Sequence, residues 1–319
     1  MADTTGGDTD IWTLLVPALL ALIAGLAIHS FIIGVNVSDW WRGRSVTPVD
    51  LIVTSLAICR IGAQCVITMD LVDCTFLMSK LDSVNLFVMR PIRKILDLSV
   101  TLLILDAIYT FFCSANIWLT SLLSIVLYVK ISNLHTRLFL YLRRMILPRT
   151  GRLIVASLLL SALNSLISQC MYKNVTTWGT YNITKSPIYK YGNDLLFFFM
   201  GTFFPLIFNS ISSVLLFVSL YHHTTRMKMS SNLSINLETY YSAMRFVSFT
   251  FLYKIMFFFC HYFGLFYYHF YSGILTWLCI FLGFLPTLHS SYLIYTTVNL
   301  RSQMSKVLQN FLLDLPDSV

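Results

Sequence analysis

Charged residues are scarce in this chain: 11% of its 319 residues are Asp, Glu, Lys or Arg, whereas 57% are hydrophobic. A water-soluble fold of this composition would have too little polar surface to cover an apolar core. The composition therefore excludes an ordinary soluble domain. The net charge of +8 fits basic loops that lie against anionic lipid, and it gives no reason to expect a nucleic-acid partner.

Catalytic and metal-binding motifs are missing as well. The chain has no Gly-rich phosphate loop, no His-Glu-x-x-His and no cysteine pairs at zinc spacing. The adjacent His222 and His223 would point roughly 100° apart on a helix, so they cannot chelate one metal together. The sequence predicts a protein that is not an enzyme and that needs no cofactor or metal.

The seven cysteines do not form a disulfide framework. Most of them fall within apolar stretches, where cysteine packs as a small hydrophobic side chain. Cys74 and Cys170 fall near the same outer face and are one candidate pair, which the sequence leaves open because their geometry is unknown. No basic region precedes the first apolar stretch, so we expect no cleavable signal peptide.

Long apolar stretches are what the chain has in abundance. A bilayer core of about 30 Å needs about 20 apolar residues of helix, and lipid-facing helices satisfy their own backbone groups. The predicted spans are 11–35, 49–71, 99–129, 153–171, 195–220, 241–263 and 273–297. They nearly consume the chain, so we expect an all-α, seven-transmembrane helix bundle, with residues 1–319 forming a single domain.

The distribution of Lys and Arg predicts the orientation, because basic loops stay in the cytoplasm. Most of these residues fall in the first, third and fifth gaps and in the tail 301–319, although a cluster at 90–94 lies on the opposite side. Segment 1–10 is acidic and lacks Lys and Arg, which suits an extracellular N-terminus. We therefore expect a multi-pass protein of the plasma membrane with a short cytoplasmic C-terminal tail.

Two Asn-x-Thr sequences begin at Asn174 and Asn182, in the gap between the fourth and fifth spans. Such sequences are acceptors for N-glycosylation, which occurs on the extracellular side. Both fall on the side predicted to be extracellular, so they are candidate glycosylation sites.

Three charged residues fall inside the predicted spans: Arg60, Asp106 and Lys254. Charge within a membrane is costly and therefore marks a functional candidate. Arg60 is expected to clamp helices together or to switch partners between states. Asp106 shares a helical face with Tyr109, Thr110 and Cys113, and this stripe either lines a cavity or forms a buried seam. Lys254 pairs either with Asp106 or elsewhere.

Seven helices without an inverted repeat or a pair of broken half-helices favour a signalling receptor over a solute carrier. Further motifs identify the family that the chain resembles. They are, in order, FIIGVNVSDW at 31–40, TSLAICRIG at 54–62, SIVLYVKISNL at 124–134, RLFLYLRRMI at 137–146, LLFVSLYHHTTRMK at 215–228 and the His-Ser and Asn-Leu-Arg sequences at 289–290 and 299–301. The chain resembles the type 2 (bitter) taste receptors, which are G-protein-coupled receptors.

The resemblance implies a small, mostly apolar bitter agonist in the extracellular half of the bundle. Its expected contacts are Asp106, Tyr109, Thr110, Cys113, Phe198, Met256, Phe259 and Cys279. Several of these positions depart from the family pattern: Tyr109 stands where many members have Trp, Cys113 where they have Asn, and Met256 where many have Tyr. Ligand preference therefore cannot be carried over. Arg60 matches the family's buried arginine and is the expected switch.

On the cytoplasmic side the resemblance implies a heterotrimeric G protein of the gustducin or inhibitory class. Its expected contacts are Lys130, His135, Arg137, Arg143, His223, Arg226, Lys228 and Arg301. Membrane lipid is a further expected partner, and sterol is a candidate. Two alternatives stay open: another chemosensory receptor, such as a type 1 vomeronasal receptor, or a small-solute carrier.

Overall fold

The computed structural model describes residues 5–81, 98–131, 137–179, 187–229, 234–271 and 276–313. Helices account for the regular structure of these segments. In chain order they are α1 (Thr5–Trp41), α2 (Pro48–Leu81), α4 (Leu98–Ile131), α5 (Arg137–Ile146), the short 3-10 helix η1 (Leu147–Arg149), α6 (Thr150–Gly179), α7 (Pro187–Met229), α8 (Ser234–Tyr271), α9 (Thr276–Thr296) and α10 (Val298–Leu313).

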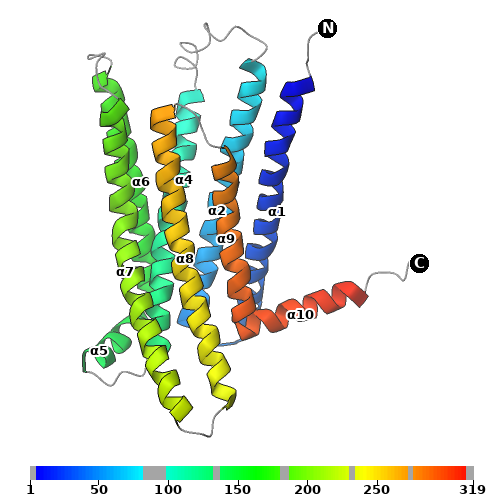
Figure 1. Cartoon of the computed structure of the whole chain (residues 1–319), viewed down its shortest axis with the longest axis vertical. Helices are drawn as coiled ribbons and strands as arrows, with labels where there is room; N and C mark the ends of the chain where they lie inside the picture. The colour runs from blue at the N-terminus through cyan, green and yellow to red at the C-terminus, as the bar shows by residue number, and fades with distance from the viewer. Residues whose placement is uncertain are drawn as a thin grey trace.

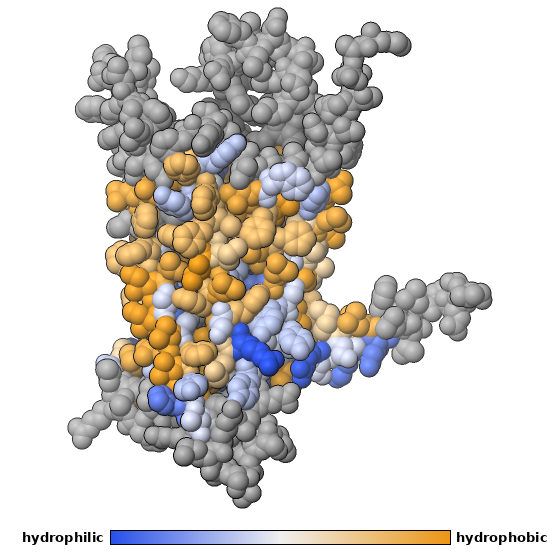
Figure 2. Space-filling model, in the orientation of Figure 1, coloured by the Kyte–Doolittle hydropathy of each residue, from blue (hydrophilic) through white to orange (hydrophobic). Residues whose placement is uncertain are grey.

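Seven stretches within the described helices are long and apolar enough to cross a membrane, which confirms the predicted fold class. The helices run roughly side by side, with the N-terminus at one end of the bundle and α5 and α10 at the other (Figure 1). Apolar side chains form a belt around the middle, and polar residues gather toward the end that carries α10 (Figure 2). The protein is therefore a multi-pass membrane protein.

The helices close into a ring with α4 at its centre. α1 packs against α2 and α9, α8 packs against α7 and α9, and α4 contacts α2, α6 and α7. The main core cluster lies where α1, α2, α4 and α9 meet, and it includes Ile32, Leu56, Leu119 and Leu293. A shift of α4 would therefore change its contacts with α2, α6 and α7 together.

The turn from α1 into α2 shows how local sequence sets a helix boundary. Gly43 adopts a positive φ of 80°, a conformation that favours glycine. α2 then begins at Pro48, whose fixed φ and missing N–H suit the first turn of a helix. Thr47 and Asp50 cap this end reciprocally: the Asp50 N–H donates to Thr47 Oγ1 (3.2 Å), and the Thr47 N–H donates to Asp50 Oδ2 (3.3 Å).

Several helices extend beyond the predicted spans. α7 has 43 residues and α8 has 38, α2 continues to Leu81, and much of the predicted tail forms α10. Hydropathy marks only the part of a helix that lies in hydrocarbon, so it misses polar turns that project into water. Asn174 consequently lies within α6 rather than in a gap, whereas Asn182 falls outside the described residues.

Candidate functional site

The extracellular half of α4 brings four of the predicted agonist contacts together. Asp106, Tyr109 and Cys113 lie on one face of α4, and Tyr109 has both of the others and Cys279 of α9 as electrostatic neighbours. The Tyr109 hydroxyl is also placed to hydrogen-bond with the Cys113 thiol. Thr110, on the same turn of α4, is half-buried. The middle of the helical stripe, at Tyr109, therefore lies near α9.

Asp106 lies at the exposed end of this stripe. Its Oδ2 accepts a hydrogen bond of 2.8 Å from Gln169 Nε2 on α6. An exposed carboxylate held by a neutral amide keeps its charge accessible to a cationic ligand. Asp106 is not the partner of Lys254, whose hydrogen bonds lie deeper in the bundle.

α8 supplies an aromatic wall opposite Tyr109. The ring centroid of His261 lies 6.1 Å from that of Tyr109 and 4.6 Å from that of Phe257. Phe257 belongs to a buried cluster with Ile117, Tyr253, Leu282 and Leu285, and Cys113 and Leu278 pack against the same cluster. We call Tyr109, Cys113, Phe257, His261 and Cys279 the outer cluster.

Met256 and Phe259 do not join the outer cluster. Their side chains are 41% and 51% exposed, and they belong to an exposed stripe on α8 that includes Leu252, Phe263 and Phe266. The helical period turns this stripe away from the buried residues Tyr253 and Phe257 of the same helix. The structure thus places these two predicted contacts on the outside of the bundle. The side chain of the remaining one, Phe198 of α7, lies outside those described.

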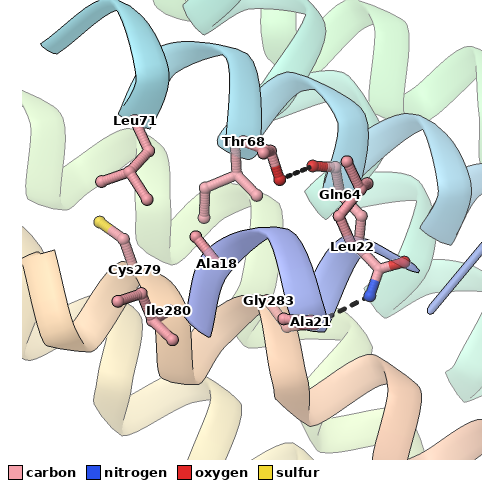
Figure 3. Close-up of a pocket in the computed structure, with 10 residues that line it drawn as sticks. Ala18, Ala21, Leu22, Gln64, Thr68, Leu71, Cys279, Ile280 and Gly283 are labelled. Atoms are coloured by element: carbon pink, nitrogen blue, oxygen red, sulfur yellow. Dashed lines mark hydrogen bonds between the residues drawn. The ribbon is translucent and has the colours of Figure 1, made fainter. Parts of the chain in front are cut away.

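Two small cavities lie near the outer cluster. One, of about 10 Å³, is formed by α1, α2 and α9, with Leu71 and Cys279 at one end and Gln64 at the other (Figure 3). The other, of about 20 Å³, lies between α4, α7 and α8 and reaches Phe257. Drug-sized ligands occupy sites of about 300–1,000 Å³, so side chains must move apart before an agonist fits.

A hydrogen-bonded network centred on Arg60 lies below the outer cluster, toward the cytoplasm. Arg60 is 1% exposed; its Nε donates to Asn116 Oδ1 (3.0 Å), and its Nη1 donates to the Pro286 carbonyl (3.4 Å) and to Ser290 Oγ (2.5 Å). The guanidinium also lies 5.6 Å from the centre of the Tyr253 ring. One side chain on α2 therefore links α4, α8 and α9, as a multi-donor group can.

Neighbouring polar side chains extend this network to the other helices. His29 of α1 shares a hydrogen bond of 2.9 Å with Ser290 Oγ. Gln64 Nε2 donates to the Gly283 carbonyl (2.9 Å; Figure 3) and to Thr287 Oγ1 (2.6 Å), which ties α2 to α9 again. Lys254 of α8 donates to α4, as its ammonium bonds the Ile117 carbonyl (2.8 Å) and Ser121 Oγ (2.6 Å). Each of these bonds joins two helices that meet at the bundle axis.

At the cytoplasmic end, the motif at 31–40 contacts the motifs at 54–62 and 299–301. Asp39 at the end of α1 accepts a hydrogen bond from Asn299 Nδ2 of α10 (2.9 Å) and forms an ion pair with Arg44 (2.9 Å). Asn36 Nδ2 donates to Thr54 Oγ1 of α2 (2.8 Å). These residues fix the first cytoplasmic turn against α2 and α10.

Three of the predicted G-protein contacts have side chains that the structure describes, and these lie at this end of the bundle. Lys130, Arg143 and Arg301 are exposed at the ends of α4, α5 and α10. Four others lie on α5 and α7 at positions where the structure does not describe the side chain: Arg137, His223, Arg226 and Lys228. His135 falls outside the described residues altogether.

Comparison with known proteins decides the family. A family model described as taste receptor protein (TAS2R) matches residues 9–311 of the chain. The chain is 29% identical to rat taste receptor type 2 member 7 over 70% of this chain and 69% of that protein. It is 30% identical to rhesus macaque taste receptor type 2 member 9 over 65% of this chain and 63% of that protein.

The chain belongs to the taste receptor type 2 family. This family consists of G-protein-coupled receptors for bitter taste, so the predicted family and the expectation that the protein is not an enzyme are confirmed. Membership decides against the vomeronasal and carrier alternatives. The alignments with these relatives cover about two thirds of their length.

Sequence reasoning missed several polar residues of this taste receptor. His261, Gln64 and Asn116 each occupy a span without a motif of their own, and only the neighbouring helices show what they contact. A usable signal was present for Asn116, which lies ten residues after Asp106 and about three helical turns further along the inward face of α4. A similar signal was present for His261, which lies seven residues after Lys254 on the same face of α8.

Proposed function

We propose that this receptor binds small, mostly apolar bitter compounds in the extracellular half of its bundle. The agonist would insert among the outer cluster, with Thr110 beside it and Asp106 at the mouth. The observation that supports this proposal is the convergence of Tyr109, Cys113 and Cys279 with His261 above the Arg60 network. Apolar walls with a few polar groups are typical of small-molecule sites.

The receptor would act in the plasma membrane and activate a heterotrimeric G protein of the gustducin or inhibitory class. The exposed Lys130, Arg143 and Arg301 support a cytoplasmic contact surface, because basic side chains there can meet acidic groups of a partner. We extend this surface to the basic residues of α5 and α7 predicted from the sequence. The apolar belt meets membrane lipid, and sterol is a candidate occupant of its crevices.

The mechanism follows from how the helices are tied together. An agonist that pushes between Tyr109 and His261 would displace α8 from α4 and disturb Tyr253, which lies under the Arg60 guanidinium. Arg60 would then exchange hydrogen-bond partners on α4 and α9. The agonist shifts the population only by its higher affinity for the active bundle.

Calcium release in cells that express the receptor with a gustducin-tail chimeric G protein tests this function. We expect a dose-dependent response to at least one member of a panel of diverse bitter compounds and bile acids, absent from untransfected cells. Tyr109→Ala should weaken agonist potency about tenfold or more, because an aromatic contact of about 1.5–3 kcal/mol is lost.

Ile108→Ala is the matched control, since Ile108 precedes Tyr109 on α4 but is exposed on the outside of the bundle. Its potency should stay within about twofold of the parent. Equal losses in the two variants at equal surface expression would contradict the proposed pocket. Silence of the parent receptor toward every compound despite surface expression would contradict the proposed agonist class.

A further inference from the structure

Lys254 is a buried cation whose described hydrogen bonds go to neutral groups. It lies in the middle of α8 and is 4% exposed. Its ammonium donates to a backbone carbonyl and to a serine oxygen, those of Ile117 and Ser121. An ammonium carries three N–H donors and a full positive charge, and a carbonyl and a hydroxyl offset that charge only in part. One donor of the group is thus available to a further partner.

A second buried cation lies close by. Arg60 donates to Asn116, which lines the same cavity as Lys254. Within the part of the chain that the structure describes, the hydrogen bonds of Arg60 also go to neutral groups, and its buried Nη2 has no hydrogen-bond partner. Two neighbouring cations far from water are costly unless something negative is near them. The centre of the bundle therefore attracts an anion.

The cavity of about 20 Å³ offers a place for one. Five side chains with polar groups line it from α4, α7 and α8: Asn116, Thr120, Thr202, Tyr253 and Lys254. Apolar side chains, including Phe257 and Phe258, close the rest of the wall. A cavity needs about 10–15 Å³ to hold one water-sized guest, so this one admits a single small ion and excludes an agonist.

The orientation of Asn116 suits an anion. Arg60 Nε donates to Asn116 Oδ1, so the acceptor end of the amide is held toward Arg60. The Nδ2 end donates to the Tyr253 hydroxyl (3.2 Å) and still has a second N–H. The side chains of Lys254 and Asn116 both line this cavity, and both carry N–H donors.

We propose that this cavity is a binding site for a monovalent anion of halide size, held by Lys254 and Asn116, and that chloride occupies it. The site shares only Phe257 with the outer cluster, and it needs no agonist. A bound chloride would offset the mutual repulsion of Lys254 and Arg60 and would tie α8 to α4. It would thereby stabilise the helix arrangement described above.

The experiment measures thermal unfolding of the purified full-length receptor without agonist, with sodium chloride replaced stepwise by sodium gluconate at constant ionic strength. Constant ionic strength removes general screening as a cause. We expect the unfolding midpoint to rise with chloride and then to saturate, as linkage requires for one site that exists only in the folded state. Bromide should act like chloride.

Lys254→Gln tests the residue. The variant keeps a donor for Ile117 but loses the charge, so its midpoint should no longer respond to chloride. Lys254→Arg should retain a response, and Lys306→Gln, on the exposed face of α10, should respond as the parent does. The proposal is overturned by equal midpoints of the parent in chloride and gluconate, or by a full chloride response in Lys254→Gln.

If Lys254→Gln does not fold, the parent alone decides. Saturating stabilisation by chloride and bromide, but not by sulfate, supports a halide-sized site. A rise that does not saturate, or that sulfate matches, is a general salt effect and overturns the proposal. If Lys254 is instead hydrated or uncharged, the unfolding midpoint will be the same in all of these salts. That result overturns the proposal.

Discussion

Arg60 shows at the residue scale how a buried charge holds a membrane bundle together. Its side chain bonds to Asn116, Pro286 and Ser290 on two other helices. The nearby positive charge of Lys254 works against it. The balance depends on the acceptors, because a buried acceptor left without its donor costs about 1–3 kcal/mol.

Arg60→Ala is therefore expected to destabilise the receptor even though it removes a like-charge repulsion. Two side-chain acceptors, Asn116 Oδ1 and Ser290 Oγ, lose their donor, which predicts a net loss of about 2 kcal/mol or more. Thermal unfolding of the purified variant measures it. The unfolding midpoint of Arg60→Lys should lie between those of the parent and Arg60→Ala, because an ammonium cannot reproduce the planar set of N–H donors of a guanidinium. An unchanged midpoint in Arg60→Ala would mean that these bonds contribute nothing net.

Lys254 also shows what sequence can and cannot supply for a single residue. Its position inside a span predicted that it needed a partner, and hydropathy alone was enough for that. The partner is the Ile117 carbonyl with Ser121, and a backbone carbonyl has no signature in a sequence. Asp106, the alternative expected from charge complementarity, instead accepts from Gln169.

At the scale of a helix, the close approach of α1 to α2 depends on Gly25. A Cβ at this position would lie 2.1 Å from Gln64 Oε1, far inside contact distance. Gln64 cannot simply turn away, because its Nε2 is bonded to Gly283 and Thr287 of α9. The contact therefore ties three helices to one glycine.

Gly25→Ala is expected to lower the unfolding midpoint of the receptor, because Gln64 must give up a hydrogen bond or α1 must move outward. We expect a cost of about 1–3 kcal/mol, typical of overpacking. Gly34→Ala on the same helix is the matched control, since its Cβ would meet nothing within 4 Å. That change should be neutral or stabilise by up to about 1 kcal/mol, as alanine favours a helix over glycine. Equal midpoints in the two variants would contradict the packing described.

The helices could be predicted from the sequence, but the side of each helix that faces the interior could be predicted only in part. The sequence placed Asp106, Tyr109 and Cys113 on one face of α4, and the structure brings these three residues near one another. α8 is mostly apolar and aromatic, but Lys254 offered a polar reference: Phe257 lies three residues after it on the same face, whereas Phe259 does not. The inward face of α8 is fixed by contacts with Tyr109 and His289, which belong to other helices. A sequence therefore predicts which side of a membrane helix faces the interior only when that side carries a polar residue.

At the scale of the whole molecule, sidedness is the property on which both proposed surfaces depend. The outer cluster and the basic residues of α4, α5 and α10 lie toward opposite ends of the bundle (Figure 1). Basic loops remain in the cytoplasm during insertion, and the acidic segment 1–10 passes across. Under the proposed function, the agonist would then reach the outer cluster from the side that carries the candidate glycosylation sites.

Epitope tags at the two ends of the chain test this orientation in intact cells. The N-terminal tag should bind antibody without permeabilisation, and the C-terminal tag only after it, because an odd number of spans places the ends on opposite sides. Removal of N-glycans should increase gel mobility, and the double variant Asn174→Gln and Asn182→Gln should lose that shift if these are the acceptors. Each single variant then shows which acceptor carries a glycan, and Asn174, within α6, is expected to be the poorer one. A C-terminal tag labelled on intact cells would reverse the bundle and place the basic residues of α5 and α10 where no G protein can reach them.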